Sequence, residues 1–364
     1  MQLVDFLEQA LSRPAPDLEA SNAFLDRHRT EPRYAIGRNA DSLNLHRLAP
    51  LDGIIDDYAS QGELWHGIPL VHADDALKRG RVANCSTSIR PLDALERLRA
   101  AGFRTIASLA GIVQAAGGAL PLPTFVEAQR REMRDHADAW QSLHDELADE
   151  ASKKTLLDVL RFRLTADPGY MRDHRVRIEQ QYFEDFMAYG GEVFVDAGGF
   201  DGDTAEAFAT RYPDYRKILL FEPSDRNMAA ARRRLSAFRD IAFYPFGLSD
   251  APGRLRFDPG SGSASSISDS GEGEIAVETL DATVAEPVTF IKMDLEGWEL
   301  RALEGSKRHV REDHPKLAIA AYHDAADLRR IRAFVSSLRH DYEVFLRHYT
   351  QGWSETVLFF RPLR

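Results

Sequence analysis

Asp196, Glu222, Asp294 and His323 each stand at the end of an apolar run in the second half of the sequence. The carboxyl ends of parallel strands meet at one edge of an open α/β sheet, where such sheets bind their ligands. If the apolar runs are strands, these polar side chains share that edge. A histidine beside a carboxylate can remove the proton of a hydroxyl group, because its unperturbed pKa is about 6.5. The pattern therefore predicts a ligand site equipped for proton transfer.

A glycine-rich turn containing Gly198 and Gly202 follows Asp196, and a helix is expected to begin near Thr204. Such a turn brings the backbone close to a ligand. A carboxylate at its start suits the amino group of a methionine moiety better than the phosphates of a dinucleotide, because like charges repel. Glu222, 26 residues after Asp196, stands where nucleotide sites place a carboxylate for both ribose hydroxyls. These residues favour S-adenosylmethionine over NAD, with a ligand-free turn and a helix-capping Glu222 as structural alternatives.

The apolar run before Asp294 contains Lys292, and Glu296 and Glu299 follow it. A lysine inside an apolar strand is costly to bury alone, so we expect Lys292 to pair with Asp294, Glu296 or Glu299. His323 comes at the end of the next expected strand. We predict that His323 and Asp294 orient and deprotonate an acceptor, and a purely structural ion pair is the alternative.

Strand-like and helical patterns alternate from residue 191 onward, which is typical of an α/β fold with a parallel sheet. The last two strand candidates are joined by too few residues for a helix, so the final strand is predicted to be antiparallel. The pattern resembles the Rossmann-like seven-stranded sheet of methyltransferases, with an added hairpin at 254–257 and 275–278 around a Gly- and Ser-rich loop at 260–273. The seven candidates are Val193–Ala197, Ile218–Glu222, Ala242–Phe246, Val288–Met293, Leu317–Tyr322, Tyr342–Leu346 and Thr356–Arg361.

The pattern divides the chain into an N-terminal helical segment (1–32), a small half-Rossmann-like α/β domain (33–120), a helical connector (121–190) and the C-terminal domain (191–364). In the small domain, one glycine of a dinucleotide fingerprint remains after the first strand, so close approach to a pyrophosphate is disfavoured. Three roles stay open for it: structure or homo-oligomerisation, substrate recognition, and independent nucleotide binding.

Composition excludes several classes of protein. The 364 residues carry 46 basic and 57 acidic side chains, so the net charge of −11 gives no global attraction to nucleic acid or an anionic membrane. The single cysteine, Cys85, excludes a disulfide framework and fits a reducing compartment, so we expect a cytoplasmic protein. The longest uncharged run, 105–126, contains glycines and prolines that argue against membrane insertion. The dispersed histidines argue against a histidine-based zinc site. Asp294 and Glu296 offer carboxylates for Mg²⁺, but two carboxylates on so acidic a chain are weak evidence, so we predict no metal site.

Residues 181–364 resemble the FkbM family of S-adenosylmethionine-dependent O-methyltransferases. The most distinctive part of the resemblance is the segment from Ile291 to Glu299, which runs on to Leu303-Glu304-Gly305. The other matching pieces are Gln181-Tyr182-Phe183, Val195-Asp196-Ala197-Gly198, Phe221-Glu222-Pro223, Thr279-Leu280-Asp281 and Ala321-Tyr322-His323. Longer members of the family carry an N-terminal α/β domain, and the connector resembles theirs. Gly199 departs from the larger residue that many members have there.

The resemblance implies methyl transfer to a hydroxyl of a sugar, glycoconjugate or secondary metabolite, so the expected partner is a small-molecule or glycan acceptor. It implies that His323, Asp294 and Glu296 surround the acceptor. The alternative functions are a non-catalytic nucleotide-sugar-binding or regulatory protein and, with less support, an NAD-dependent sugar oxidoreductase. The residues implied to bind the cofactor are Tyr182, Asp196, Gly198, Gly202, Thr204, Glu222, Pro223 and Asp294.

Overall fold

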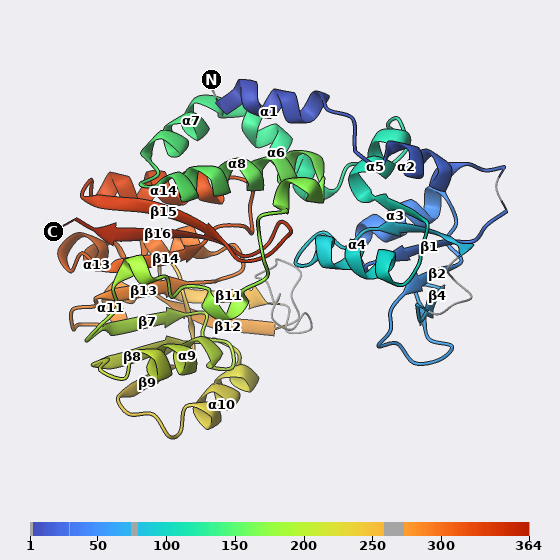
Figure 1. The fold of residues 1–364 in the computed structure, drawn as a ribbon. Coiled ribbons are helices and arrows are strands. Elements are labelled where there is room, and N and C mark those ends of the chain that lie inside the picture. The colour runs from blue at the N-terminus through green and yellow to red at the C-terminus, as the bar shows by residue number, and fades with distance from the viewer. Residues whose placement is uncertain (1–2, 29, 74–78, 258–272, 364) are drawn as a thin grey trace. The chain divides into compact units, whose positions relative to one another are not determined.

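The computed structural model describes residues 3–28, 30–73, 79–257 and 273–363, and these form two compact units. Unit 1 comprises Met1–His144, Lys154–Ile178 and His348–Ser354, and unit 2 comprises Asp145–Lys153, Glu179–Arg347 and Glu355–Arg364. Each unit is built around its own sheet (Figure 1). Apart from Gly273, the Gly- and Ser-rich loop expected at 260–273 lies outside the described residues.

The sheet of unit 1 has the strand order β3-β4-β2-β1-β5-β6, and it is parallel except for the pairing of β3 with β4. Successive side chains alternate between two buried clusters, one containing Ala35 and Ile54 and the other Tyr34 and Ile55. Burial on both faces is typical of parallel sheets. The strands are β1 (Arg33–Ile36), β2 (Gly53–Ile55), β3 (Leu64–Trp65), β4 (Ile68–Val71), β5 (Arg81–Asn84) and β6 (Thr105–Ser108).

Helices precede, connect and follow these strands. The helix α4 (Pro91–Ala100) is followed by Gly102, which has the left-handed conformation that helix ends favour. The helices are α1 (Leu3–Ser12), α2 (Leu18–Leu25), α3 (Ala40–Leu48), α4 (Pro91–Ala100), α5 (Leu109–Ala115), α6 (Thr124–Asp135), α7 (Ala137–Glu146) and α8 (Glu150–Thr165), followed by the short 3-10 helices η2 (Pro168–Met171), η3 (Ile178–Gln180) and η4 (Asp185–Met187).

Side chains of the chain itself fill the turn between β1 and α3. Asn39 caps α3 by accepting the N–H of Ser42 at 3.0 Å, and its amide donates to the carbonyl of Cys85 at 2.7 Å. The Ser42 hydroxyl donates to the carbonyl of Gly37 at 2.5 Å. An N-terminal helix N–H that a phosphate would use in a dinucleotide site is therefore already bound.

Unit 2 contains a seven-stranded sheet with the order β15-β16-β14-β13-β7-β8-β9, which Figure 1 shows from top to bottom. The final strand, β16, pairs antiparallel with β14, as the short connection predicted. All seven predicted strands are present, and their ends differ from the predicted ones by at most two residues. They are β7 (Val193–Ala197), β8 (Lys217–Phe221), β9 (Ile241–Tyr244), β13 (Phe290–Met293), β14 (Lys316–Ala320), β15 (Tyr342–His348) and β16 (Thr356–Pro362).

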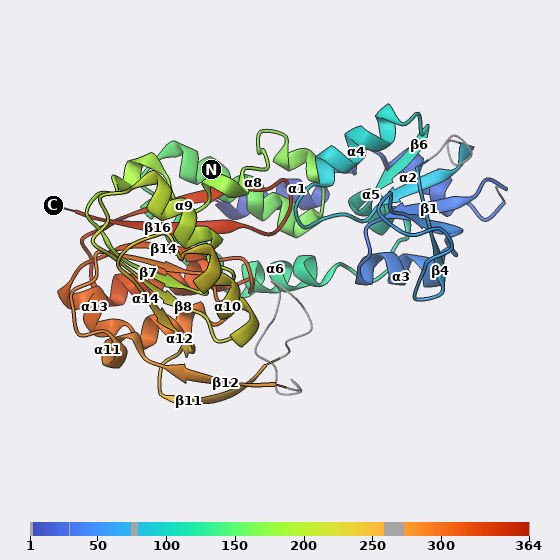
Figure 2. The same ribbon diagram turned by 90° about the horizontal axis from the view of Figure 1, so that it is seen from below.

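The predicted hairpin is also present, as a small sheet that lies apart from the main one (Figure 2). It consists of β10 (Gly247–Leu248), β11 (Gly253–Phe257) and β12 (Gly273–Glu278), with β11 and β12 antiparallel. No helix in the described part of the chain is long and apolar enough to cross a membrane. The helices of unit 2 are α9 (Asp203–Arg211), α10 (Asp225–Arg234), α11 (Leu280–Thr283), α12 (Glu299–Glu304), α13 (Lys307–Glu312) and α14 (Asp327–Leu338).

The strand register brings four strand ends to one edge of the main sheet. Ala197 of β7 is level with Phe221 of β8 and with Met293 of β13, which is in turn level with Ile319 of β14. The residues that follow these strands therefore emerge side by side. Because β16 runs the other way, its first residue also lies at this edge, opposite the end of β14.

Gly198 has no room for a side chain at this edge. A Cβ there would lie 1.9 Å from the carbonyl oxygen of Asp294, and the residue has a φ of +77°. We predict that Gly198→Ala lowers the free energy of unfolding by about 2–5 kcal/mol, from left-handed strain and overpacking together. Gly253→Ala is the matched control, since a Cβ at Gly253 would meet nothing closer than 4.0 Å. Equal stability of both variants in urea unfolding would contradict the prediction.

Candidate active site

A buried ion pair joins the central strands beneath the glycine turn. Lys292 Nζ of β13 lies 3.0 Å from Asp196 Oδ1 of β7, and both side chains are almost completely buried. The prediction that Lys292 pairs with Asp294, Glu296 or Glu299 was wrong. The register is the reason: Lys292 is directly level with Asp196, and side chains level on neighbouring strands point to the same face.

The same lysine holds the glycine turn. Lys292 Nζ donates to the carbonyl oxygens of Gly198 at 2.8 Å and Ala197 at 3.4 Å. Burial lowers the pKa of Lys292, but the charges of Asp196, Asp294 and Asp203 and the hydrogen bond to Asp196 together outweigh burial and raise it, so the lysine is protonated. Burial raises the pKa of Asp196, and Lys292 opposes that rise. Among the described residues, Asp196 Oδ2 has no hydrogen-bond partner, although it is fully buried.

Glu222 connects the turn to the next helix. Its Oε2 accepts the N–H of Phe200 at 3.1 Å, and its Oε1 accepts the N–H of Ser224 at 2.9 Å at the start of α10. Burial raises the pKa of Glu222, while these hydrogen bonds act in the opposite direction. Phe200 has a φ of 44° and is 37% exposed, so an aromatic ring is presented at the turn in a strained backbone conformation.

Asp294 begins a chain of hydrogen bonds that crosses the sheet edge. The Tyr182 hydroxyl donates to Asp294 Oδ2 at 2.6 Å, and the Gln181 amide donates to the Tyr182 oxygen at 2.9 Å. The same amide donates to Glu355 Oε2 at 2.8 Å, at the start of β16. Burial and the charge of Asp294 raise the pKa of Tyr182 well above its usual value, so this hydroxyl keeps its proton and acts as a donor.

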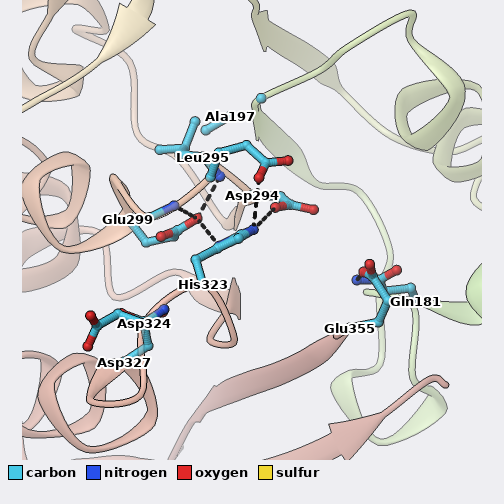
Figure 3. Close-up of polar contacts among 12 residues, drawn as sticks. Gln181, Ala197, Asp294, Leu295, Glu299, His323, Asp324, Asp327 and Glu355 are labelled. Atoms are coloured by element: carbon cyan, nitrogen blue, oxygen red, sulfur yellow. Dashed lines mark hydrogen bonds and ion pairs between the residues drawn. The ribbon is translucent and has the colours of Figure 1, made fainter. Parts of the chain in front are cut away.

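His323 lies between carboxylates on both sides of its ring (Figure 3). Its Nδ1 is 3.1 Å from Glu299 Oε1, and its Nε2 is 3.4 Å from Glu296 Oε2 and 3.6 Å from Asp294 Oδ1. Burial lowers the pKa of His323, but Glu299, Asp294 and Glu296 outweigh it and raise the pKa to about 9. Burial raises the pKa of Glu296 to about 7. The histidine is therefore mostly protonated at neutral pH, and Glu296 titrates near it.

The structure brings most of the predicted residues together, but not all. Lys292 joins Asp196 to the carbonyl of Gly198. Asp294 contacts Tyr182 directly, and His323 forms ion pairs with Glu296 and Asp294. Gly202 adopts the left-handed conformation before α9. Thr204 hydrogen-bonds to Asp203, and Pro223 follows Glu222. Within the described residues, neither Thr204 nor Pro223 forms a hydrogen bond with Asp294 or His323.

Two residues of the site, Glu355 and Glu299, were not predicted from the sequence to belong to it. Glu355 lies at the start of the antiparallel strand β16, so its position at this edge follows from the strand direction that the sequence did predict. Glu299 was considered only as a partner of Lys292. Its spacing of five residues after Asp294 carried no signal, because contact with His323 depends on the fold of the intervening turn.

The cluster also has the residue types of a metal site. One ligand atom each from Asp294, Glu299 and His323 lies within 4.8 Å of the others. However, Glu299 Oε1 already accepts the N–H groups of Leu295 and Gly297, and the two ring nitrogens face different carboxylates. This arrangement favours an ion-paired imidazolium over a metal-ligating imidazole, whose free nitrogen must bind the ion.

The strand order of unit 2, with antiparallel β16 between β14 and β15, defines a Rossmann-like α/β sheet of the methyltransferase type. Residues 196–344 match the family model of the methyltransferase FkbM domain. The chain carries an FkbM methyltransferase domain, and the resemblance noted in the sequence is confirmed. No curated protein is significantly similar to the chain in sequence.

A crystal structure of methyltransferase FkbM from Methylobacillus flagellatus is similar over nearly the whole length, with 25% identity, 98% of each chain covered and a TM-score of 0.76. The similarity extends over both units. An rRNA methylase from Streptococcus thermophilus has 18% identity over 50% of this chain and 93% of its own, with a TM-score of 0.35. A fibrillarin from Aeropyrum pernix, in complex with S-adenosyl-L-methionine, has 12% identity over 50% and 71%, with a TM-score of 0.33.

The buried ion pair generates a stability prediction. Lys292→Met removes the cation and leaves Asp196 buried without its partner, so the free energy of unfolding should fall by about 3–5 kcal/mol. The double variant Asp196→Asn with Lys292→Met should recover part of that loss, because it removes the uncompensated charge. Urea unfolding of the single and double variants measures this coupling. A double variant that loses the sum of the two single losses would show that the residues do not act as a pair.

Proposed function

We propose that the protein is an S-adenosylmethionine-dependent O-methyltransferase that acts on a hydroxyl of a sugar, glycoconjugate or secondary metabolite. The observation that carries the proposal is the position of His323, Asp294 and Glu296 at the same sheet edge as the turn from Asp196 to Gly202. A group that accepts a proton thus lies beside a turn suited to the cofactor. The FkbM domain supports methyl transfer as the reaction.

The residues of the turn fit S-adenosylmethionine. The unpartnered Asp196 Oδ2 offers an acceptor for the ammonium of a methionine moiety, and Gly198 and Gly202 keep side chains away from the turn. Glu222 follows β8, where a carboxylate can accept the ribose hydroxyls. When bound, the cofactor supplies a methyl group on a cationic sulfonium, whose S–C bond breaks as the acceptor oxygen forms the new O–C bond.

His323 then takes the acceptor proton. Its Nε2 accepts the proton of the hydroxyl group, and the electron pair of that O–H bond remains on the attacking oxygen. Asp294 is held by the hydroxyl of Tyr182 and orients the acceptor beside the ring. The methyl group needs little further electrophilic activation, because the leaving group of the cofactor is already cationic.

The other assignments concern unit 1 and the compartment. We propose a structural or oligomerising role for unit 1, because the turn before α3 is filled by Asn39 and Ser42 of the chain itself. We propose a cytoplasmic location, because the single cysteine fits a reducing compartment.

The cofactor assignment predicts binding of S-adenosylhomocysteine. Calorimetric titration should give a micromolar Kd, whereas NAD and a nucleotide sugar should not bind. Glu222→Gln should weaken binding by about tenfold, since a charge-assisted hydrogen bond to the ribose contributes about 1.5–3 kcal/mol. Glu343→Gln is the control, because Glu343 binds Arg361 away from the turn. If NAD binds and S-adenosylhomocysteine does not, the result would contradict the proposal and favour an oxidoreductase.

The acceptor assignment predicts a strong pH dependence. A base must be deprotonated to act, so kcat/KM should rise with pH through about 9, the pKa of His323. His323→Ala should lower kcat by about 100-fold or more and leave the Kd of S-adenosylhomocysteine unchanged. The pH profile also separates the two candidate bases. An ascending limb near pH 7 that persists in His323→Ala would assign the proton transfer to Glu296 instead.

A further inference from the structure

Glu299 is placed by the backbone as well as by packing. It is 1% exposed at the first position of α12. Its Oε1 accepts the N–H of Leu295 at 2.7 Å and the N–H of Gly297 at 3.4 Å (Figure 3). Glu296 and Gly297, which lie between Leu295 and Glu299 in the chain, have positive φ values of 54° and 93°, respectively. The carboxylate therefore closes a tight turn and cannot swing away without opening it.

The same oxygen faces the imidazole. Glu299 Oε1 lies 3.1 Å from His323 Nδ1, whereas the opposite nitrogen, Nε2, faces the partly exposed side chains of Asp294 and Glu296. One side of the ring is thus bound to a fully buried carboxylate and the other side points to the more open part of the site. A buried carboxylate at Nδ1 fixes the tautomer that carries its proton on Nδ1 and leaves the Nε2 lone pair free.

We propose that Glu299 is the positioning residue of His323, holding Nδ1–H so that Nε2 faces the acceptor hydroxyl. The inference rests on the proposed methyl transfer. The acceptor proton moves to Nε2, its bonding electrons stay on the acceptor oxygen, and the resulting imidazolium is stabilised by the charge of Glu299. Glu299 itself touches neither acceptor nor cofactor.

Other charged groups also surround the ring. Asp294 and Glu296 lie on the turn after β13, Asp327 lies on α14, and Glu355 immediately precedes β16. Each of these carboxylates has an electrostatic interaction with His323. Burial and the charge of Glu299 raise the pKa of Asp327 to about 7. Glu299 is the one among these carboxylates that contacts Nδ1 in the described structure, so its removal has a distinct signature.

The test compares Glu299→Gln with Asp313→Asn. The glutamine keeps an oxygen for the Leu295 N–H but loses the charge. Asp313 forms a similar buried pair, 2.6 Å from Nδ1 of His309, and lies outside the site, so Asp313→Asn is the matched control. NMR titration of the His323 imidazole, assigned through His323→Gln, gives its pKa without any need for activity. The pH profile of kcat/KM and the Kd of S-adenosylhomocysteine complete the comparison.

We expect Glu299→Gln to lower the pKa of His323 by about one pH unit or more, because an opposite charge within contact distance is lost. The ascending limb of the pH profile should move with it, and kcat on the plateau should fall by about tenfold or more. The Kd of S-adenosylhomocysteine should stay the same. Asp313→Asn should change none of these. Glu299→Asp, which retains the charge, should restore the pKa and serves if the glutamine variant does not fold.

An unchanged His323 pKa in both Glu299 variants would overturn the proposal, as would a Glu299→Gln profile identical to that of Asp313→Asn. A His323 signal that disappears with Mn²⁺ and returns with EDTA, with activity restored only by the metal, would replace it with a metal-ligating role. If S-adenosylhomocysteine fails to bind while the pKa still falls in Glu299→Gln, the ion pair stands and the proposed methyl transfer fails.

Discussion

The buried pair of Asp196 and Lys292 is the interaction on which the site depends. It joins β7 to β13, and the same ammonium holds the carbonyl of Gly198, so one charge fixes both strands and the turn above them. Removing either partner leaves an uncompensated charge in the core, whereas the intact pair also orders the backbone that approaches the cofactor. The pair therefore couples the stability of the sheet to the geometry of the turn.

The other residues of the site are positioned by the edge of the main sheet. Three parallel strands deliver Glu222, Asp294 and His323 to one line, and the antiparallel β16 adds Glu355 from the opposite chain direction. A chain of hydrogen bonds then links Glu355 to Asp294 through the side chains of Gln181 and Tyr182. Strand register thus makes neighbours of Glu222, Asp294 and His323, which are distant in the sequence.

This division explains what the sequence could predict. The strands and their ends follow from apolar runs, so the gathering of Asp294 and His323 at one edge was foreseeable. The partner of Lys292 was not, because it lies 96 residues away and depends on which strands become neighbours. The contact of Glu299 with His323 was not foreseeable either. It depends on a turn with two positive φ values, which no residue pattern in the sequence indicates.

Several strained backbone conformations lie at the same edge of the sheet. Of the nine non-glycine residues with positive φ in the described chain, Tyr182, Phe200, Glu296 and Glu355 belong to the site or its turn. Each such conformation costs about 1–3 kcal/mol and persists only where surrounding contacts determine it. Tyr182 is fixed by Asp294, Phe200 by Glu222, and the turn of Glu296 by Glu299. Acidic side chains thus hold the strained backbone in place, and two of them, Asp294 and Glu299, also raise the pKa of His323. The conformation of the site and the proton affinity of His323 are therefore set in part by the same carboxylates.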